Sequence, residues 1–144
     1  MVTDMEQRVQ DSFDRQPVMA TIGATLTQVK PGEVTIELPV RSNLTQQHGF
    51  VHAGIVTLIV DTACGYAALT LMPPLAAVLT VEFKVNFLSP ATGEKLIARG
   101  WVIKPGKTLM VCLGEVKAQN GGEDKLVATI QATMIAREGT GLVG

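Results

Sequence analysis

The feature that most constrains this sequence is one long apolar segment with a single acid near its middle. The segment VHAGIVTLIVDTACGYAALTLM, from Val51 to Met72, contains Asp61 as its only charged residue. Its length would suit a membrane-spanning helix, but an acid at the centre of a bilayer costs about 2.5–3.5 kcal/mol on insertion scales. We therefore predict that residues 51–72 form one long buried helix of a protein that has no membrane partner.

Composition and charge narrow the class of protein further. With 144 residues, 47% of them hydrophobic and 17% charged, residues 1–144 are predicted to form one globular domain that buries about two-thirds of its unfolded surface. A formal net charge of −1 provides no electrostatic field for nucleic acid or for an acidic membrane. The N-terminus lacks the pattern of a signal peptide, and the isolated residues Cys64 and Cys112 are typical of buried thiols in a reducing compartment. These features predict a cytoplasmic protein.

Hydrophobic periodicity predicts the other elements. Near the N-terminus apolar residues recur every four positions, which predicts a short helix over about residues 4–15 that Pro17 ends. Extended runs, several with the alternating apolar and polar residues of a half-buried strand, predict strands. These runs are Ala20–Val29, Gly32–Val40, Ala77–Leu88, Lys95–Lys104, Thr108–Gln119 and Leu126–Ala136.

The connections between these runs predict how the strands pair. Pro31-Gly32, Pro105-Gly106 and Asn120-Gly121-Gly122 are turn sequences that separate neighbouring runs. Consecutive hairpins produce an antiparallel sheet, and one face of that sheet must cover the apolar helix. The predicted fold class is therefore α+β.

Three motifs, in the same order, resemble those of a known family. The segment QQHGFVHAG, residues 46–54, is followed by Asp61 seven residues later. It is similar to the signature of the phenylacetate-degradation type (PaaI-like) acyl-CoA thioesterases: an amide residue, a glycine three positions on, His-Gly-Gly opening the central helix, and an acid in mid-helix. The segments Val81–Ala91 and Lys104–Thr108 also resemble that family's strand pair. The resemblance covers about residues 18–136.

This resemblance implies a fold and an activity. The implied fold is the hotdog fold, in which a six-stranded antiparallel sheet wraps around one long central helix. The implied reaction converts an acyl-CoA partner and water into a carboxylic acid and free coenzyme A, with no bound cofactor and no metal. Two positions depart from the family pattern, because Gln46 replaces a frequent Asn and Ala53 replaces the first glycine of the pair. The second departure is mild, since the function at position 53 belongs to a backbone N–H and not to a side chain.

The residues themselves suggest how such chemistry would proceed. Gly49, Ala53 and Gly54 keep the start of the helix bare, so an acyl carbonyl could reach the free N–H groups of the first turn. The N–H groups of Ala53 and Gly54 would stabilise an oxyanion, and Gln46 would hold the attacking water or the thioester through its side-chain amide. Asp61 would act as a base or as a nucleophile, with a pKa raised by burial. The structural alternative for Asp61 is a carboxylate that caps a loop or pairs with a hidden cation.

Helix geometry predicts a site shared between subunits. Ala53 and Asp61 are eight residues apart, which is about 12 Å along one helix. One carbonyl needs its oxyanion donors and its attacking group about 3 Å away, so a single helix cannot supply both. Two helices packed antiparallel about a two-fold axis can, and this predicts an obligate homodimer. We also expect two dimers to form a tetramer, as is common in such families.

Other polar residues have competing interpretations. His48 and His52 are spaced like metal ligands but are separated by Gly49 and have no third ligand nearby, so no metal is predicted. The resemblance implies that His52 orders its loop and that Thr80 is a hydroxyl near the acid, although Thr80 is equally an ordinary strand residue.

Lys104 and Lys107 also have two interpretations. By resemblance they would lie near the phosphates of coenzyme A, and otherwise they belong to a solvated turn. Four large side chains belong to the core or to the acyl pocket, a choice that the sequence leaves open: Phe50, Tyr66, Leu71 and Met72. Two other functions also remain: a hotdog hydratase or dehydratase, whose His-rich motif is absent, and a non-catalytic acyl-CoA-binding protein, against which Asp61 and Gln46 argue.

Overall fold

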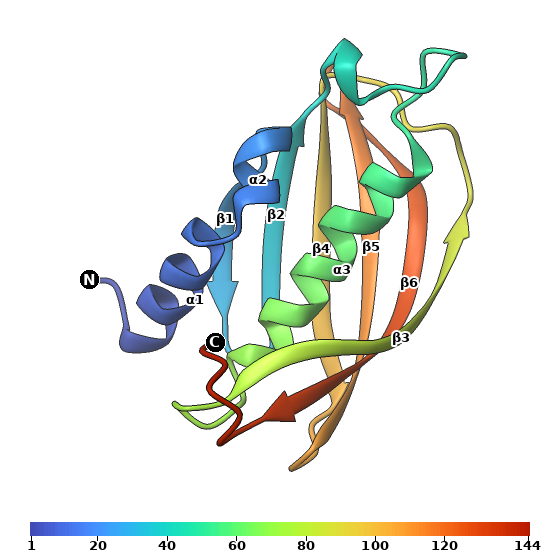
Figure 1. Ribbon diagram of the computed structural model, residues 1–144. Helices are drawn as coiled ribbons and strands as arrows, with labels where there is room; N and C mark the ends of the chain where they lie inside the picture. Colours follow the sequence, from blue (N-terminus) through green and yellow to red (C-terminus); the bar gives the residue numbers. More distant parts are fainter.

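The computed structural model describes residues 1–144 as six strands, three α-helices and one short 3₁₀ helix (Figure 1). The helices are α1 (Asp4–Asp14), α2 (Pro17–Ile22), the 3₁₀ helix η1 (Ser42–Leu44) and α3 (Ala53–Leu69). The strands are β1 (Thr25–Lys30), β2 (Glu33–Pro39), β3 (Ala77–Phe87), β4 (Lys95–Lys104), β5 (Leu109–Asn120) and β6 (Glu123–Arg137).

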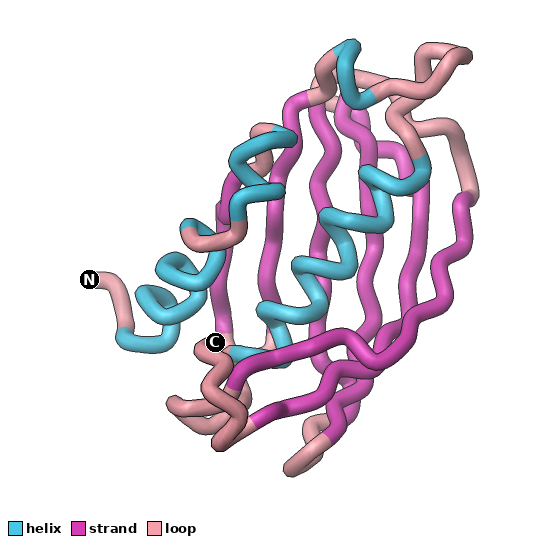
Figure 2. Tube along the Cα trace, in the orientation of Figure 1, coloured by secondary structure: helices cyan, strands magenta, loops and turns pink.

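All six strands form one sheet that curves around α3. Their order is β1-β2-β4-β5-β6-β3, and every neighbouring pair is antiparallel. The ribbon and the tube both show α3 lying along the concave face, with β3 crossing at one edge (Figures 1 and 2). This is the hotdog fold, so the predicted α+β class and the single sheet around one long helix are confirmed.

The core lies between α3 and the sheet. A cluster of 33 buried hydrophobic residues includes Ile59, Val60 and Ala63 from the helix, each fully buried. The two layers touch because β4 carries Gly100, where an added Cβ would lie only 2.6 Å from the backbone nitrogen of Cys64. Position 100 therefore needs glycine if the helix is to rest directly on the sheet.

The N-terminal region contains the one element that the sequence interpretation misassigned. Residues 4–14 form the expected helix, and Thr3 caps it by accepting a hydrogen bond from the N–H of Glu6. The predicted strand Ala20–Val29 is wrong in its first part, because residues 17–22 are helical and only Thr25–Lys30 is extended. Pro17 does not only end α1: it occupies the first turn of α2, where its missing N–H costs nothing. Gly23, at φ +82°, then ends α2.

The central helix is shorter than its apolar segment. It begins at Ala53 because the side chain of His52 caps it, and it ends at Leu69, whereas we predicted residues 51–72. Arg8 of α1 holds the chain that follows, because its guanidinium donates to the carbonyl oxygens of Leu69, Met72, Pro73 and Ala76. No helix in the structure combines the length and the hydropathy needed to span a membrane.

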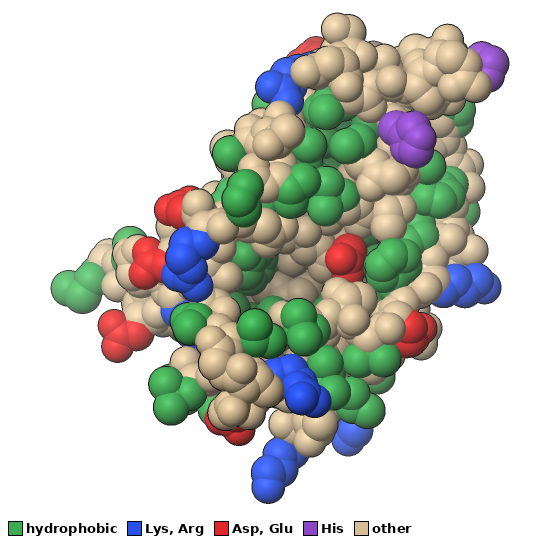
Figure 3. All heavy atoms as spheres, viewed as in Figure 1, with side chains coloured by type: hydrophobic (Ala, Val, Ile, Leu, Met, Phe, Trp, Pro, Cys, Tyr) green, Lys and Arg blue, Asp and Glu red, His purple; other side chains and the backbone are tan.

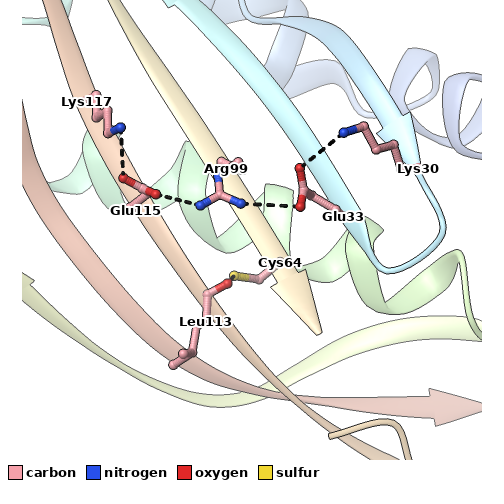
Figure 4. A network of polar contacts seen from close by, with 7 residues as sticks. All are labelled: Lys30, Glu33, Cys64, Arg99, Leu113, Glu115 and Lys117. Atoms are coloured by element: carbon pink, nitrogen blue, oxygen red, sulfur yellow. Dashed lines mark hydrogen bonds and ion pairs between the residues drawn. The ribbon is translucent and has the colours of Figure 1, made fainter. Parts of the chain in front are cut away.

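The convex face of the sheet carries an ion network rather than a core. Arg99 donates to Glu33 at 3.3 Å and to Glu115 at 2.8 Å, and Lys30 and Lys117 extend the network on either side (Figure 4). Side chains alternate along a strand, and Ala98 and Gly100 face α3, so Arg99 points away from the helix. This face is therefore chemically separate from the concave face.

The two cysteines are buried free thiols, as predicted. Burial raises the pKa of Cys112 to about 11 and raises that of Cys64 well above its ordinary value. The Sγ of Cys112 lies 3.6 Å from the carbonyl oxygen of Cys64, and that of Cys64 lies 3.5 Å from the carbonyl oxygen of Leu113 (Figure 4). Neither thiol is suited to be a nucleophile, because the thiolate is the reactive form.

Candidate active site

The first turn of α3 presents one unpaired backbone donor to solvent. His52 caps the helix: its Nδ1 accepts from the N–H of Gly54 at 2.8 Å, and its carbonyl accepts from Ile55 and Val56. The N–H of Ala53 has no partner in the chain, and Ala53 is exposed. A free N–H at the positive end of a 17-residue helix is suited to bind a negatively charged oxygen.

This arrangement changes one expectation from the sequence. Gly54 was expected to offer its N–H together with Ala53, but in the structure that N–H is bonded to His52. The reason is local: an imidazole at the N-cap position can reach the N–H two residues ahead, as other capping side chains do. His52 therefore orders the start of the helix, in line with the resemblance, and leaves Ala53 as the available donor.

Gln46 provides a second free donor beside this turn. Its Oε1 accepts from the N–H groups of His48 at 2.6 Å and Phe50 at 3.3 Å, which fixes the side chain in its loop. Gly49 closes this loop at φ +85°, a conformation that favours glycine, and donates its N–H to the carbonyl of Gln46 at 2.9 Å. The Nε2 group of Gln46 has no partner in the chain, so both of its hydrogens remain available.

A cavity of about 500 Å³ contains these donors. Gln46, His52 and Ala53 line its polar side. Its apolar side comes from Phe50 on the same loop and from the end of β3 with the chain that follows, residues 87–91, within the motif Val81–Ala91 that resembled the family. An elongated ligand with a polar group at the helix start and an apolar remainder would match the polar and apolar sides of this cavity.

Asp61 lies in the middle of α3, partly buried and without a cationic partner. No ion pair in the structure includes it, and its one hydrogen bond is accepted by Oδ1 from the hydroxyl of Thr80 on β3, at 2.9 Å. Burial raises the pKa of Asp61 above its ordinary value, and the hydrogen bond from Thr80 opposes that rise. Within the chain, Asp61 therefore neither caps a loop nor pairs with a cation.

A second, smaller cavity of about 150 Å³ opens beside Asp61. Thr80, Tyr66 and Gln16 line it together with the acid. It shares no lining residue with the larger cavity, in agreement with the separation of about 12 Å between Ala53 and Asp61 along the helix. The space-filling view shows hydrophobic side chains gathered around a hollow on this face of the molecule (Figure 3).

The remaining candidate residues lie elsewhere. His48 is exposed, and no group of three His, Cys, Asp or Glu side chains is arranged to hold a metal ion. Lys104 and Lys107 are exposed, form no ion pair, and lie where β4 joins β5. The C-terminal end of α3 lies at the same end of the sheet. Gly32 connects the two, because its carbonyl accepts from the N–H of Val102 on β4 and its N–H donates to the hydroxyl of Thr70 at the helix C-cap.

The structure also divides the four large side chains that the sequence left unassigned. Phe50 lines the larger cavity and Tyr66 the smaller one. Met72 is buried in the core, and Leu71 is exposed at the end of the helix. Gln16 was not anticipated at all, because nothing in the local sequence indicates that the connection between α1 and α2 lies beside Asp61.

Comparison with known proteins identifies the family. A family model described as the thioesterase superfamily matches residues 48–125, which include the whole of α3. The chain belongs to the thioesterase superfamily. It is accordingly a hydrolase that acts on thioester bonds.

Individual thioesterases match most of the chain. A thioesterase family protein from Silicibacter pomeroyi has 53% sequence identity and a TM-score of 0.91, over 97% of this chain and 99% of that one. Human acyl-coenzyme A thioesterase 13 is 31% identical over 105 residues, which are 72% of this chain and 73% of the human protein. The PaaI protein of Escherichia coli shares the fold, with a TM-score of 0.85 at 21% identity over 94% of this chain and 95% of that one.

Proposed function

We propose that this protein is an acyl-CoA thioesterase that hydrolyses an acyl- or aryl-CoA to the carboxylic acid and free coenzyme A. The observation that carries the proposal is that one helix bears an unpaired N–H at its first residue, Ala53, and an acid without a cationic partner, Asp61, at its middle. The thioesterase named among the relatives acts on acyl-coenzyme A, which supports the same substrate class. No bound cofactor or metal takes part in the proposed reaction.

The proposed mechanism begins with the carbonyl oxygen of the thioester. That oxygen accepts hydrogen bonds from the N–H of Ala53 and from Nε2 of Gln46, which stabilise the negative charge of the tetrahedral intermediate. Asp61 takes a proton from water as the water oxygen attacks the carbonyl carbon. When the intermediate collapses, the C–S bond breaks and the protonated Asp61 returns a proton to the leaving thiolate.

A second route uses the same residues with Asp61 as the nucleophile. Its carboxylate attacks the carbonyl carbon, the thiolate of coenzyme A leaves, and water then hydrolyses the mixed anhydride. Incorporation of label into Asp61 during a single turnover in ¹⁸O-labelled water identifies the anhydride route. The anhydride route places the label in Asp61 when water attacks the aspartyl carbon, whereas direct attack by water labels only the product acid.

We further propose that each site is shared by two subunits of a homodimer. The outer edge of β3 has no strand partner, and β3 and the residue after it expose five large apolar side chains: Leu79, Val81, Phe83, Phe87 and Leu88. An unpaired edge with apolar side chains favours pairing with another strand, and a second copy of β3 provides one about a two-fold axis. Ala53 and Gln46 of one subunit would then face Asp61 and Thr80 of the other. Two such dimers would form the expected tetramer, and sedimentation equilibrium measures the mass.

Lys104 and Lys107 are proposed to bind the phosphates of coenzyme A. Both ammonium groups are exposed and free of ion pairs, and they lie at the end of the sheet where α3 stops. In an antiparallel pair of helices, that end of one subunit lies toward the helix start of its partner. These lysines would therefore approach the nucleotide of a substrate whose thioester is held at the partner's Ala53.

Mixing two inactive variants tests the shared site. Gln46→Ala and Asp61→Ala homo-oligomers should each be weak, and co-refolding them at equal amounts should yield about half heterodimers. Each heterodimer holds one site with both changes and one with neither, so activity should recover to about a quarter of wild type per site. Native mass spectrometry confirms that subunits have exchanged. Exchange without recovery would show that the site lies within one chain.

The alternative functions are separated by two assays. Release of free thiol from acyl-CoA distinguishes hydrolysis from non-catalytic binding, in which the thioester survives. Addition of water to crotonyl-CoA without thiol release would instead indicate a hydratase.

A further inference from the structure

One side chain of the N-terminal helix joins the end of α3 to the chain that leads into β3. The guanidinium of Arg8 on α1 donates at 2.8–3.4 Å to four carbonyl oxygens, those of Leu69, Met72, Pro73 and Ala76. No ion pair in the structure includes Arg8, so its charge faces carbonyl dipoles rather than a carboxylate. A cation is favoured at the C-terminal end of a helix, where carbonyl groups lack partners within the helix. Arg8 therefore caps α3 from a different helix.

The connection from α3 to β3, residues 70–76, depends on this guanidinium for its course. It has no regular secondary structure. The carbonyls of Met72 and Ala76 accept hydrogen bonds from Arg8 and from no other group in the chain. Leu75 is 82% exposed, so its side chain adds little packing. Removal of Arg8 would leave the connection with few of its present restraints.

This connection joins the two elements that carry Asp61 and Thr80. Asp61 lies eight residues before Leu69, the last residue of α3, and Thr80 lies four residues after Ala76. The hydroxyl of Thr80 donates to Asp61 at 2.9 Å. α3 and β3 are therefore tied at two points, by Arg8 at the end of the helix and by this hydrogen bond near its middle.

The pairing of β3 with its neighbour fixes Thr80 only weakly. Within one chain β3 pairs with β6 alone, and the register shifts between Thr80 and Glu82, so Val81 is an extra residue. Such a bulge disrupts the ladder locally and bends the strand. Because O–H···O bonds span only about 2.5–3.0 Å, a displacement of about 1 Å would remove the bond to Asp61. The position of Thr80 therefore depends on the segment that precedes it, which Arg8 holds.

We propose that Arg8 is a positioning residue, which keeps Thr80 within hydrogen-bonding distance of Asp61 by fixing the connection between α3 and β3. The N-terminal helix thus takes part in the reaction, although no residue of α1 lines either cavity. The consequence for hydrolysis rests on the proposed function. The consequence for the bond between Thr80 and Asp61 does not.

Replacement of Arg8 should affect Asp61 as the loss of the Thr80 hydroxyl does. Burial raises the pKa of Asp61 and the hydrogen bond from Thr80 lowers it. Both Arg8→Ala and Thr80→Val should therefore move the acid limb of the kcat/KM profile, the fall in activity as pH decreases, to higher pH. On that limb Arg8→Ala should reduce kcat/KM by about tenfold, the effect of one hydrogen bond to a charged group. The double variant should show no larger shift than either single variant, because both changes remove the same bond.

The surroundings of Asp61 allow a clean reading of this shift. Two other titratable side chains lie near the acid, Tyr66 in the same cavity and the buried Cys64 on the same helix, and Arg8 is bonded to neither. Arg15→Ala is the matched control, because it removes the same charge from the end of α1. Arg15 donates to the carbonyl of Gly144 and to none in the connection, so the control should retain the wild-type limb.

A conservative variant keeps the test informative. Val9 and Phe13 bury α1 in the core independently of Arg8, and thermal unfolding verifies that Arg8→Ala is folded. Arg8→Lys replaces it where it is not: lysine keeps the charge but lacks the planar fork of donors, so the limb should move in the same direction by a smaller amount.

Two results would overturn the inference alone: a wild-type acid limb in the folded Arg8 variant, or a double variant whose shift is the sum of the single shifts. Absence of hydrolysis with every thioester would instead contradict the proposed function. The ¹³C resonance of the Asp61 carboxyl group, assigned by its loss in Asp61→Asn, then tests the inference by itself. Its pKa should be higher in Arg8→Ala than in wild type, and equal values would refute the role of Arg8.

Discussion

The first turn of α3 and the middle of α3 belong to one helix but offer opposite chemistry. At the first turn, Ala53 and Gln46 present unpaired hydrogen-bond donors to a cavity of about 500 Å³. Near the middle, Asp61 presents an acceptor whose pKa is raised by burial, beside a cavity of about 150 Å³. The donors suit a developing negative charge, and the acid suits the removal of a proton.

The difference shows why neither region is complete by itself. Thioester hydrolysis needs both kinds of group within reach of one carbon atom, and about 12 Å of helix separates them in one chain. The exposed edge of β3, next to Thr80 and Asp61, is where a second copy of the chain could place its Ala53 and Gln46 close to Asp61.

The largest effect is expected at Asp61. Asp61→Asn keeps the size of the side chain but removes the base, so kcat should fall by about 10²–10⁴-fold in a thiol-release assay. Assembly should not change, which sedimentation can verify. Hydrolysis within a few-fold of wild type would show that the acid has no catalytic role.

The same variant should be more stable than wild type at neutral pH. The folded-state pKa of Asp61 is raised, so between the unfolded and folded pKa values the folded protein binds more protons. Stability then falls as pH rises through that window, and the deficit persists above it. Asn carries no charge and avoids the deficit. Thermal unfolding should show a higher Tm for Asp61→Asn at pH 7, with the difference shrinking as pH falls below the ordinary aspartate pKa.

A smaller loss is expected when the donor of Gln46 is removed. Gln46→Glu retains an oxygen that can accept from His48 and Phe50 but replaces Nε2 with a second acceptor. Loss of one oxyanion donor should lower kcat by about 10²–10³-fold. Gln47→Glu, which adds the same charge one residue later, is the control and should retain most activity. Equal losses in both variants would attribute the effect to charge alone.

The smallest effect is expected at Thr80 and should appear in the pH profile. Activity needs ionised Asp61, so kcat/KM should fall as pH decreases through the pKa of that group. The hydrogen bond from Thr80 lowers this pKa, so Thr80→Val should move the acid limb to higher pH. Thr133→Val is a suitable control, because Thr133 donates to Glu82 rather than to Asp61. An unshifted profile in Thr80→Val would show that the bond does not act on the reacting acid.

Much of the fold was predictable because its signals are local. The apolar segment around Asp61 predicted α3, and the Pro-Gly and Gly-Gly turns predicted the hairpins that the structure shows. The failure at Ala20–Val29 has a local cause too, since the sequence TIGATL fits a helix end as well as a strand. Pro17 and Gly23 favour the helix, because each residue type is common at the helix position that it occupies, Pro in the first turn and Gly at the C-terminal end.

The candidate site was predictable as a set of residue types but not as a set of contacts. Asp61, Gln46 and the helix start could be chosen from the sequence because an acid in an apolar segment is costly and a bare helix start is recognisable. The sequence could not predict that His52 accepts the hydrogen bond from the N–H of Gly54. Gly54 has the same neighbours in the sequence whether or not the imidazole turns toward it.

The sequence by itself therefore determined the long helix, the antiparallel strands and the kinds of group that the site contains, since periodicity, turns and caps depend on residues within a few positions of one another. Only the tertiary structure decided which of those groups are free, which cavity each one faces, and that Ser12 and Gln16 meet Tyr66 more than 45 residues away. The physical reason is that a hydrogen bond needs its two atoms about 3 Å apart. Positions that are distant in the sequence reach that separation only through the packing of the whole chain.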